Sequence, residues 1–149
     1  MEKTIKQEEA IDFQVRWAWH KIIKMYNAEA ANYGLSMAIG QVLLNIDKDG
    51  TPSTKLGPKM GMEPRSLTRM LKSLEDKGLI YKQADEVDKR TVRVYLTEEG
   101  KKKRKLTRKT VLHFNKFMRE NIPKTKMKHF FDVLTKISEL IDENDIYEK

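Results

Sequence analysis

The chain has 149 residues and a formal net charge of +8, which favours a polyanionic partner such as nucleic acid, although charge can also serve solubility alone. Its length fits one domain with a real core, and its lack of cysteine excludes disulfides, thiolate-bound metals and cysteine nucleophiles, as suits a reducing cytoplasm. No apolar run is long enough for a membrane span, and the charged N-terminus is unlike a signal peptide.

The first predicted element is a long amphipathic helix over about residues 7–32, in which apolar side chains recur at spacings of three and four. A second helix begins after Ser36, whose hydroxyl is typical of an N-cap. A polar turn over 47–50 separates this helix from a short third helix over about 53–60.

The fourth predicted helix begins with Pro64, which is well suited to the first helical position, and stops at Gly78. The period of the pattern then changes from helix to strand. Residues 79–84 and 92–96 are predicted to form two strands, joined by a polar tip over 85–90.

Two further helices complete the chain, and Pro123 separates the fifth from the sixth. The order of elements predicts a mainly α fold with a small β-hairpin wing, that is, a winged helix-turn-helix with N- and C-terminal dimerisation helices. We expect a single domain over 1–149, with a DNA-binding lobe over 35–100 and dimerisation helices over 7–33 and 101–145.

The apolar stripes of the first, fifth and sixth helices exceed what a small lobe can cover. Burying them against a second copy of the chain is the simplest solution, so a homodimer is predicted. A monomer whose terminal helices pack together is the alternative. A two-fold dimer would place two recognition helices about one DNA turn apart, so half-sites should lie roughly 10 bp apart.

The fourth helix separates apolar residues from basic ones. A helix that docks in a major groove needs this division, because its back packs on the domain and its front meets bases and phosphates. An ordinary surface helix with a solvated basic face would show the same pattern. The residues predicted to contact DNA from the third and fourth helices are Ser53, Lys55, Arg65, Ser66, Thr68, Arg69 and Lys72.

The hairpin tip carries Asp88, Lys89 and Arg90. A projecting arginine suits the narrow minor groove, and the carboxylate two residues earlier is placed to orient its guanidinium. The alternative is that the tip is charged only because it is exposed. The basic run over 101–109 is interpreted mainly as a solvated helix surface, with some side chains near flanking phosphates.

Several short motifs follow one another between residues 34 and 100. They are Gly34-Leu35-Ser36 with Gln41, Ser66-Leu67-Thr68-Arg69, Leu74-Glu75-Asp76-Lys77-Gly78-Leu79-Ile80, Asp85 with Asp88-Lys89-Arg90, and Val94-Tyr95-Leu96-Thr97-Glu98-Glu99-Gly100. In this combination the sequence resembles the MarR family of bacterial winged helix-turn-helix transcriptional regulators.

The resemblance implies a homodimer that is held by helices from both chain ends and binds a pseudo-palindromic operator in double-stranded DNA. Many such proteins repress transcription and release DNA when a small aromatic or anionic effector binds. The resemblance also implies that the fourth helix enters the major groove, that Arg90 enters the minor groove, and that Asp88 orients Arg90.

The sequence departs from the family pattern at Gly57-Pro58, inside the third helix. Proline removes a backbone donor, so this helix is expected to be shortened or kinked, which would change how Lys55 and Lys59 meet DNA. The N-terminal cysteine of the peroxide-sensing branch is absent, which excludes direct thiol sensing.

An effector pocket is expected between the dimer helices and the DNA-binding lobe. Aromatic and methionine side chains at helical spacing are often plain core, which is the alternative interpretation. The histidines are scattered, so no metal site or other cofactor is expected. The residues predicted to line the pocket are Trp17, Trp19, His20, Met37, His113 and Phe114.

Two other classes of function are alternatives to DNA binding. An enzyme is disfavoured, since the chain has no phosphate-binding glycine loop, nucleophile elbow or metal motif. A winged-helix adaptor that binds proteins without specific DNA binding should have an apolar or acidic front on the fourth helix. That front is basic here, so the prediction is a cytoplasmic, sequence-specific DNA-binding regulator, a repressor released by a small effector.

Overall fold

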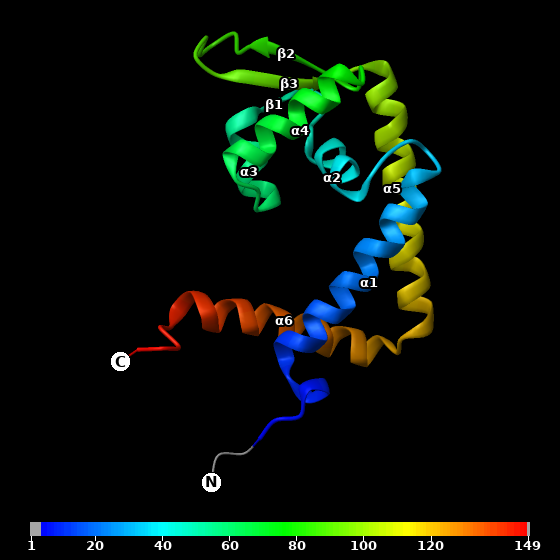
Figure 1. The fold of residues 1–149 in the computed structure, drawn as a ribbon, viewed down its shortest axis with the longest axis vertical. Coiled ribbons are helices and arrows are strands. Elements are labelled where there is room, and N and C mark those ends of the chain that lie inside the picture. The colour runs from blue at the N-terminus through cyan, green and yellow to red at the C-terminus, as the bar shows by residue number, and fades with distance from the viewer. Residues whose placement is uncertain (1–3, 149) are drawn as a thin grey trace. The chain divides into compact units, whose positions relative to one another are not determined.

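The computed structural model describes residues 4–148, which form two compact units with a boundary after Thr110. Ten short and long elements follow one another along this part of the chain (Figure 1). Six α-helices and one small sheet confirm the predicted fold class. No helix in the described range is long and apolar enough to cross a membrane.

The N-terminal segment is interrupted where a continuous helix was predicted. A 3-10 turn, η1 (Gln7–Glu9), comes first, and α1 (Ile11–Ala31) follows. The extended backbone of Ala10 (φ −75°, ψ 131°) separates them. Helix α2 (Met37–Asn45) begins as predicted, because the Ser36 hydroxyl accepts a hydrogen bond from the Ile39 amide at 3.2 Å.

The predicted turn over 47–50 leads into a strand that the sequence did not reveal. Strand β1 (Thr51–Pro52) pairs antiparallel with β3 (Val92–Leu96), so that Thr51 faces Val94. Two residues are too few to display the alternation by which strands are predicted. Gly50 stands at φ 82°, and a Cβ there would collide with the ring of Tyr95, so glycine is needed at the end of this turn.

Helix α3 (Ser53–Met60) continues through Pro58, so the proline does not shorten it below its predicted length. It ends at Gly61, whose left-handed backbone (φ 61°) lets the Met62 amide donate to the Gly57 carbonyl at 3.0 Å. Pro58 has no backbone N–H to donate to the carbonyl four residues earlier, so α3 lacks that one helical bond, yet the helix continues for two more residues.

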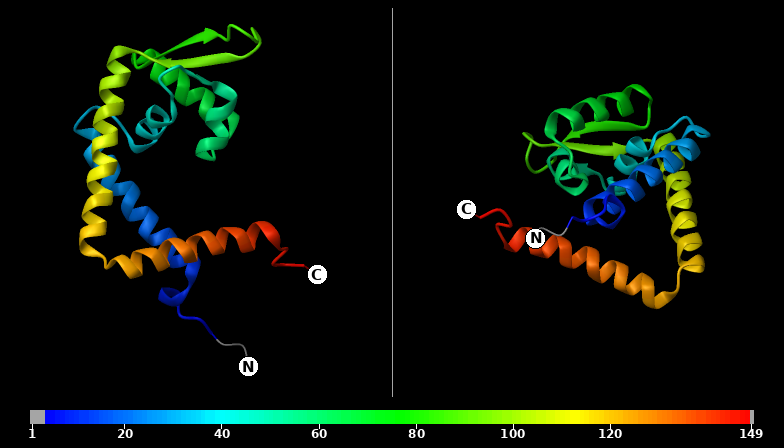
Figure 2. Two further views of the ribbon diagram at one scale, coloured as in Figure 1. Left: turned by 180° about the vertical axis from the view of Figure 1, so that it is seen from behind. Right: turned by 60° about the horizontal axis from the view of Figure 1, so that its bottom comes forward.

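Helix α4 (Pro64–Asp76) packs beside a hairpin of β2 (Ile80–Ala84) and β3. The sheet order is β1-β3-β2, and every pair is antiparallel. Figures 1 and 2 show the hairpin running along α4, with its tip projecting from the lobe. This is the predicted wing.

One core holds the lobe together. Leucine, isoleucine and valine side chains of α2, α3, α4 and the sheet meet in it, and burying each contributes about 1.5–3 kcal/mol before entropy is counted. The buried apolar residues are Ile39, Val42, Leu43, Ile46, Leu56, Leu67, Leu71, Leu74, Leu79, Ile80, Val94 and Leu96.

Helix α5 (Glu98–Asn121) leaves the lobe and crosses the boundary between the two units. Its start is fixed by Thr97, whose hydroxyl donates to the Gly78 carbonyl and accepts from the Gly100 amide. A Cβ on Gly100 would overlap the Leu79 carbonyl, so the start of α5 lies against the residue that precedes β2. Helix α6 (Lys124–Glu143) follows Pro123, as predicted.

Candidate nucleic-acid interface

The two faces of α4 are as the sequence predicted. Leu67, Leu71 and Leu74 are at most 6% exposed and join the core. The opposite face is in solvent, and its arginines and lysine make no ion pair or hydrogen bond within residues 4–148, which leaves their charges available to a ligand. The exposed residues on this front are Arg65, Ser66, Thr68, Arg69 and Lys72.

The hydroxyl of Thr68 is already engaged within α4. It donates to the Pro64 carbonyl at 2.8 Å, so only its lone pairs and methyl group face outward. Ser66, by contrast, has a hydroxyl without a partner in the part of the chain that the structure describes. The two neighbouring hydroxyls therefore differ in what they can offer to DNA.

Helix α3 presents one free lysine and one paired lysine. Lys55 is exposed, and Ser53 is partly exposed at the first position of the helix. Lys59, one turn beyond Lys55, has its ammonium group 3.8 Å from the Asp47 carboxylate. Lys55 is therefore the lysine of α3 whose charge is available, in addition to those on the front of α4.

The wing tip is held in one shape by two aspartates. Asp85 accepts from the Asp88 amide at 3.0 Å, and Asp88 accepts from the Arg90 amide at 3.0 Å and from the Thr91 hydroxyl at 3.3 Å. The side chains of Lys89 and Arg90 extend into solvent without a partner in the described residues. This tip is a hydrogen-bonded turn that carries two free cations.

Asp88 contacts Arg90 through the backbone. The carboxylate bonds the Arg90 backbone amide, and no ion pair joins it to the guanidinium within residues 4–148. An aspartate at the start of a turn commonly bonds the amide two residues on, because its side chain is short. Asp88 therefore sets the backbone from which Arg90 projects and leaves the guanidinium free.

Arg93 is a structural residue of the wing that the sequence reasoning missed. Its guanidinium donates to the carbonyls of Asp49 (3.3 Å) and Gly50 (3.0 Å) and lies 3.5 Å from the Asp85 carboxylate. It therefore ties β3 to the 47–50 turn and to the tip at once. Its two carbonyl partners lie more than 40 residues away along the chain, so no local pattern could have indicated them.

The basic run at the start of α5 is not only a solvated surface. The ammonium group of Lys103 donates to the Tyr33 carbonyl at 2.8 Å. The guanidinium of Arg104 donates to the carbonyls of Leu43 (3.1 Å) and Leu44 (3.4 Å) at the end of α2. Cations at a helix C-terminus satisfy its unpaired carbonyls, so these two residues fasten α5 to α1 and α2.

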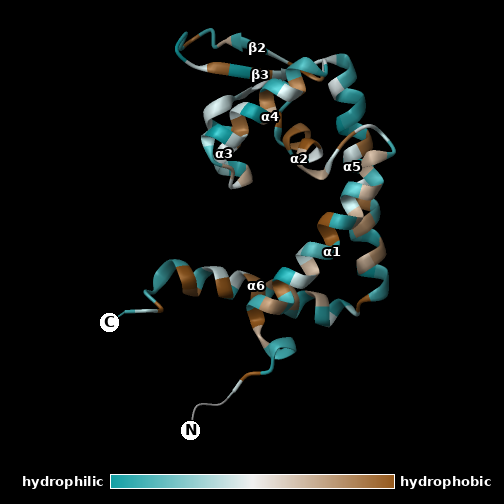
Figure 3. Ribbon diagram, in the orientation of Figure 1, coloured by the Kyte–Doolittle hydropathy of each residue, from teal (hydrophilic) through white to brown (hydrophobic). Residues whose placement is uncertain are grey.

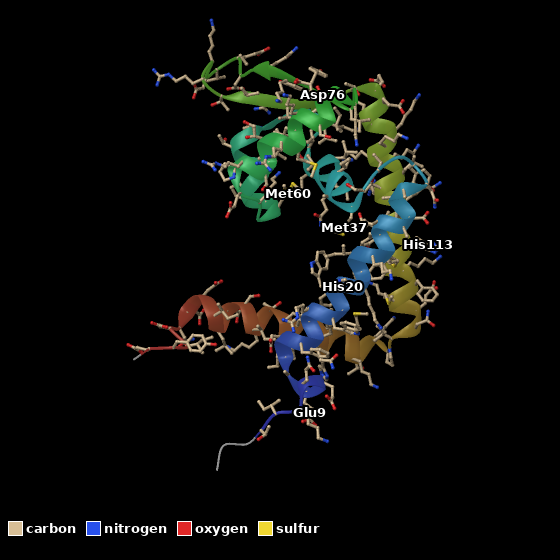
Figure 4. All side chains as sticks on the ribbon, in the orientation of Figure 1. Glu9, His20, Met37, Met60, Asp76 and His113 are labelled. Carbon is tan, nitrogen blue, oxygen red and sulfur yellow. The ribbon has the colours of Figure 1, made fainter. Side chains whose placement is uncertain are left out.

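The predicted effector residues fall in separate places. Trp17 and His20 are exposed neighbours on α1, with ring centroids 6.1 Å apart, and Lys21 lies over the Trp17 ring. The amide of Met37 donates to Asn27 at 2.8 Å at the start of α2 (Figure 4). His113 belongs to the other compact unit, and within the first unit the structure brings Trp17 and His20 together.

Two further observations concern ionisable groups. Burial raises the pKa of the Tyr26 hydroxyl on α1 above its ordinary value. Within residues 4–148, no group of three or more histidine and acidic side chains is placed to hold a metal ion.

This winged helix, whose recognition helix α4 and wing both carry free cations, was compared with known proteins. The model of the MarR family matches residues 35–92, and SarZ, an HTH-type transcriptional regulator of Staphylococcus aureus, is 34% identical over 99 residues. That alignment covers 65% of this chain and 67% of SarZ. The chain belongs to the MarR family.

Other comparisons agree with this MarR assignment. SarZ of Staphylococcus epidermidis is 35% identical over 82 residues, which span 54% of this chain and 55% of that protein, or about half its length. A solved MepR–DNA complex from S. aureus has a TM-score of 0.81 at 17% identity and covers 87% of this chain and 97% of that one. CouR of Rhodococcus jostii, bound to p-coumaroyl-CoA, has a TM-score of 0.79 at 23% identity, covering 90% and 95%. The two structures show that the fold is shared.

Proposed function

We propose that the protein is a sequence-specific transcriptional regulator that binds double-stranded DNA as a homodimer. The observation that carries this proposal is the front of α4, where unpaired Arg65, Arg69 and Lys72 lie opposite three buried leucines. A helix of this kind can dock in the major groove without exposing apolar surface. Membership of a family of regulators and the DNA bound to MepR support the proposal.

The α4 residues divide by the contacts that their chemistry allows. Arg65 and Arg69 can fork onto guanine edges, and Ser66 can donate to a base or a phosphate. Lys72 and Lys55 are point charges suited to phosphates, and Ser53 at the start of α3 can donate to a phosphate. Thr68 can offer its methyl group to a thymine because its proton is engaged.

The wing supplies a second contact in this proposal. Arg90 enters the minor groove, Lys89 contacts a phosphate, and Asp88 holds the turn from which both project. A guanidinium with no carboxylate bound to it has no ion pair to break before it enters the groove. The turn hydrogen bonds fix its direction before DNA arrives, which lowers the entropy cost of binding.

We assign the terminal helices to dimerisation, keeping the predicted limits of 7–33 and 101–145 around a lobe over 35–100. Large apolar side chains stand exposed on α1 and α6, and Figure 3 shows apolar residues recurring along both helices. A second copy is the partner that would cover them in a two-fold regulator. Those at least 45% exposed are Ile11, Val15, Trp17, Trp19, Phe130, Phe131, Val133, Leu140 and Ile141.

We further propose that the protein represses transcription until a small aromatic or anionic effector binds. CouR was solved with p-coumaroyl-CoA, which shows that a protein of this fold accepts such a molecule. Trp17, His20, Met37 and His113 remain the residues proposed for an effector pocket. A regulator of this kind acts in the cytoplasm, where the bacterial chromosome lies, and it needs no catalytic residues.

The alternative is an adaptor that binds proteins but not specific DNA. DNA selection and the salt dependence of DNA affinity separate it from the proposed regulator. Selecting bound fragments from the source genome should yield a pseudo-palindromic site whose affinity falls steeply as salt rises, because phosphate contacts release counterions. Random DNA of equal length is the control. Selection of no common site, or equal affinity for random DNA, would favour the adaptor.

A further inference from the structure

A cleft of about 390 Å³ lies at the corner where α5 ends and α6 begins. Its apolar surface is open to solvent, since Ile122 is 37% exposed and Phe131 is 45% exposed. The guanidinium of Arg119 lies over the Phe131 ring, with its Cζ atom 5.4 Å from the ring centre. The cleft therefore offers accessible apolar surface and cations together. Its lining residues are Arg119, Ile122, Lys124, Met127, Lys128 and Phe131.

The opposite end of α6 carries the complementary chemistry, on residues 142–148, which we call the acidic segment. After the helix, the Asp145 carboxylate accepts from the Tyr147 amide at 3.1 Å, and the Asp145 carbonyl accepts from the Glu148 amide at 3.2 Å. The resulting turn leaves Ile146 62% exposed and Tyr147 87% exposed. The carboxylates of the segment are exposed and form no ion pair within residues 4–148; they belong to Asp142, Glu143, Asp145 and Glu148.

The charges of α6 are arranged against its own helix dipole. Lysines stand in the first turns and carboxylates in the last, whereas acidic residues stabilise a helix at its N-terminus and basic residues at its C-terminus. The stability of the isolated helix therefore does not explain this arrangement. Two antiparallel copies of α6 explain it, because the acidic end of each then lies beside the basic end of the other.

The acidic segment is too far from the cleft of its own chain to fill it. The cleft lies at the first two turns of α6 and the segment begins in its last turn, so most of a 20-residue helix, about 30 Å long, separates them. A second copy placed antiparallel brings its segment to the cleft. We propose that residues 142–148 of each copy dock in the α5–α6 cleft of the other, an inference that rests on the proposed homodimer and adds a direction and a contact to it.

Docking of this segment matches both parts of the cleft. The Tyr147 ring covers the exposed apolar surface and keeps its hydroxyl near solvent, as tyrosines at interfaces commonly do. The carboxylates of the segment meet the ammonium groups of Lys124 and Lys128, neither of which has a partner in the described residues. The contact forms twice in a two-fold dimer, and once one has formed the second is intramolecular, which favours this segment over a free anion.

Because the chain has no cysteine, a pair of introduced cysteines reports this contact directly. The full-length double variant Met127→Cys, Tyr147→Cys should form a disulfide-linked dimer on oxidation, which non-reducing gel electrophoresis separates from the monomer. The control pair is Lys126→Cys, Tyr147→Cys, whose first position lies on α6 outside the cleft, and it should cross-link at least tenfold more slowly. Equal rates for the two pairs, or a disulfide within one chain, would overturn the proposal.

Charge reversal with rescue is the second test. Lys124→Glu, Lys128→Glu should raise the dimer dissociation constant at least tenfold in sedimentation equilibrium, and adding Asp142→Lys, Glu148→Lys to the same chain should restore it to within about threefold. These changes suit the helix dipole of α6, so a weaker dimer would not result from unfolding of that helix. The matched control, Lys109→Glu, Lys126→Glu, reverses two exposed charges outside the cleft and should have little effect.

The outcomes separate this inference from the proposed homodimer. A dimer that Lys124→Glu, Lys128→Glu leaves unchanged would form without the docked segment, so only the docking would be wrong. A weakened dimer without rescue would mean that the cleft binds something other than residues 142–148, which would also overturn the docking. A wild-type chain that stays monomeric at micromolar concentration would overturn the homodimer itself.

Discussion

The DNA-binding lobe and the terminal helices bury their apolar residues to very different degrees. Leu43, Ile46, Leu56, Leu74 and Val94 of the lobe are completely buried within one chain. Neither α1 nor α6 contains a single buried residue, although both carry large apolar side chains. The lobe can therefore be stable through its own contacts. For α1 and α6 we propose that a second copy of the chain covers their apolar side chains.

This difference separates two kinds of information in the sequence. Lobe residues specify a fold that presents α4 and the wing. In the proposed dimer, residues of the terminal helices set the distance between two such lobes. Substitutions in the first group should change stability itself, and those in the second should change how stability depends on protein concentration. Variants of each kind test this difference.

The largest effect should come from the lobe core. Replacing the fully buried Leu43 with alanine should lower the free energy of unfolding by about 2–5 kcal/mol, because it removes apolar contacts and leaves a cavity. Urea denaturation followed by circular dichroism measures this at several protein concentrations. Val87→Ala, at a wing-tip position that is 95% exposed, is the control and should change stability by less than about 0.5 kcal/mol. If Leu43→Ala and Val87→Ala lowered the free energy of unfolding equally, Leu43 would not belong to the stabilising core.

A smaller effect is expected from the apolar stripe of α6. Ile141 is 57% exposed in one chain, and Ile141→Glu should weaken dimerisation at least tenfold, or about 1.4 kcal/mol, by placing a charge in the interface. Sedimentation equilibrium measures the dissociation constant. Lys126→Glu, a change at another exposed position on α6, should leave it nearly unchanged. An Ile141→Glu protein that dimerises like the wild type would remove this stripe from the interface.

The smallest effect should come from the tie between the wing and the 47–50 turn. Arg93→Gln removes two hydrogen bonds to carbonyls and the pairing with Asp85, at a side chain that is 27% exposed. Because the site is partly solvated, we expect a stability loss of only about 1 kcal/mol, with severalfold weaker DNA binding. Thermal unfolding and fluorescence anisotropy measure the two changes. Lys102→Gln is the charge control, and equal DNA affinity in the two variants would show that the tie does not position the wing.

The helices and the hairpin were predictable because their signals are local. Ser36, Pro64, Gly78 and Thr97 mark helix ends through hydrogen bonds or backbone angles that each residue type favours. The two-residue strand β1 was missed, since its existence depends on pairing with β3 far along the chain. The break at Ala10 was also missed, as alanine is a good helix former and carries no stop signal.

Some features of the candidate interface were likewise predictable from local signals, and others were not. The two faces of α4 follow from helical spacing alone, so its exposed front could be predicted. The roles of Arg93 and Arg104 depend on carbonyls about 40 to 60 residues away, which no spacing rule reaches. The amide contact of Asp88 was not predicted, because it depends on the local geometry of the turn.

The most direct test of the proposed interface is the affinity of Arg90→Ala for the operator selected from the source genome, measured by fluorescence anisotropy at fixed salt. The proposal predicts at least tenfold weaker binding, since a free guanidinium is lost from the minor groove, with unfolding unchanged because Arg90 has no side-chain partner in the described residues. The control is Lys109→Ala, which removes one exposed charge from α5. Operator affinity equal to that of the wild type in Arg90→Ala would contradict the role assigned to the wing.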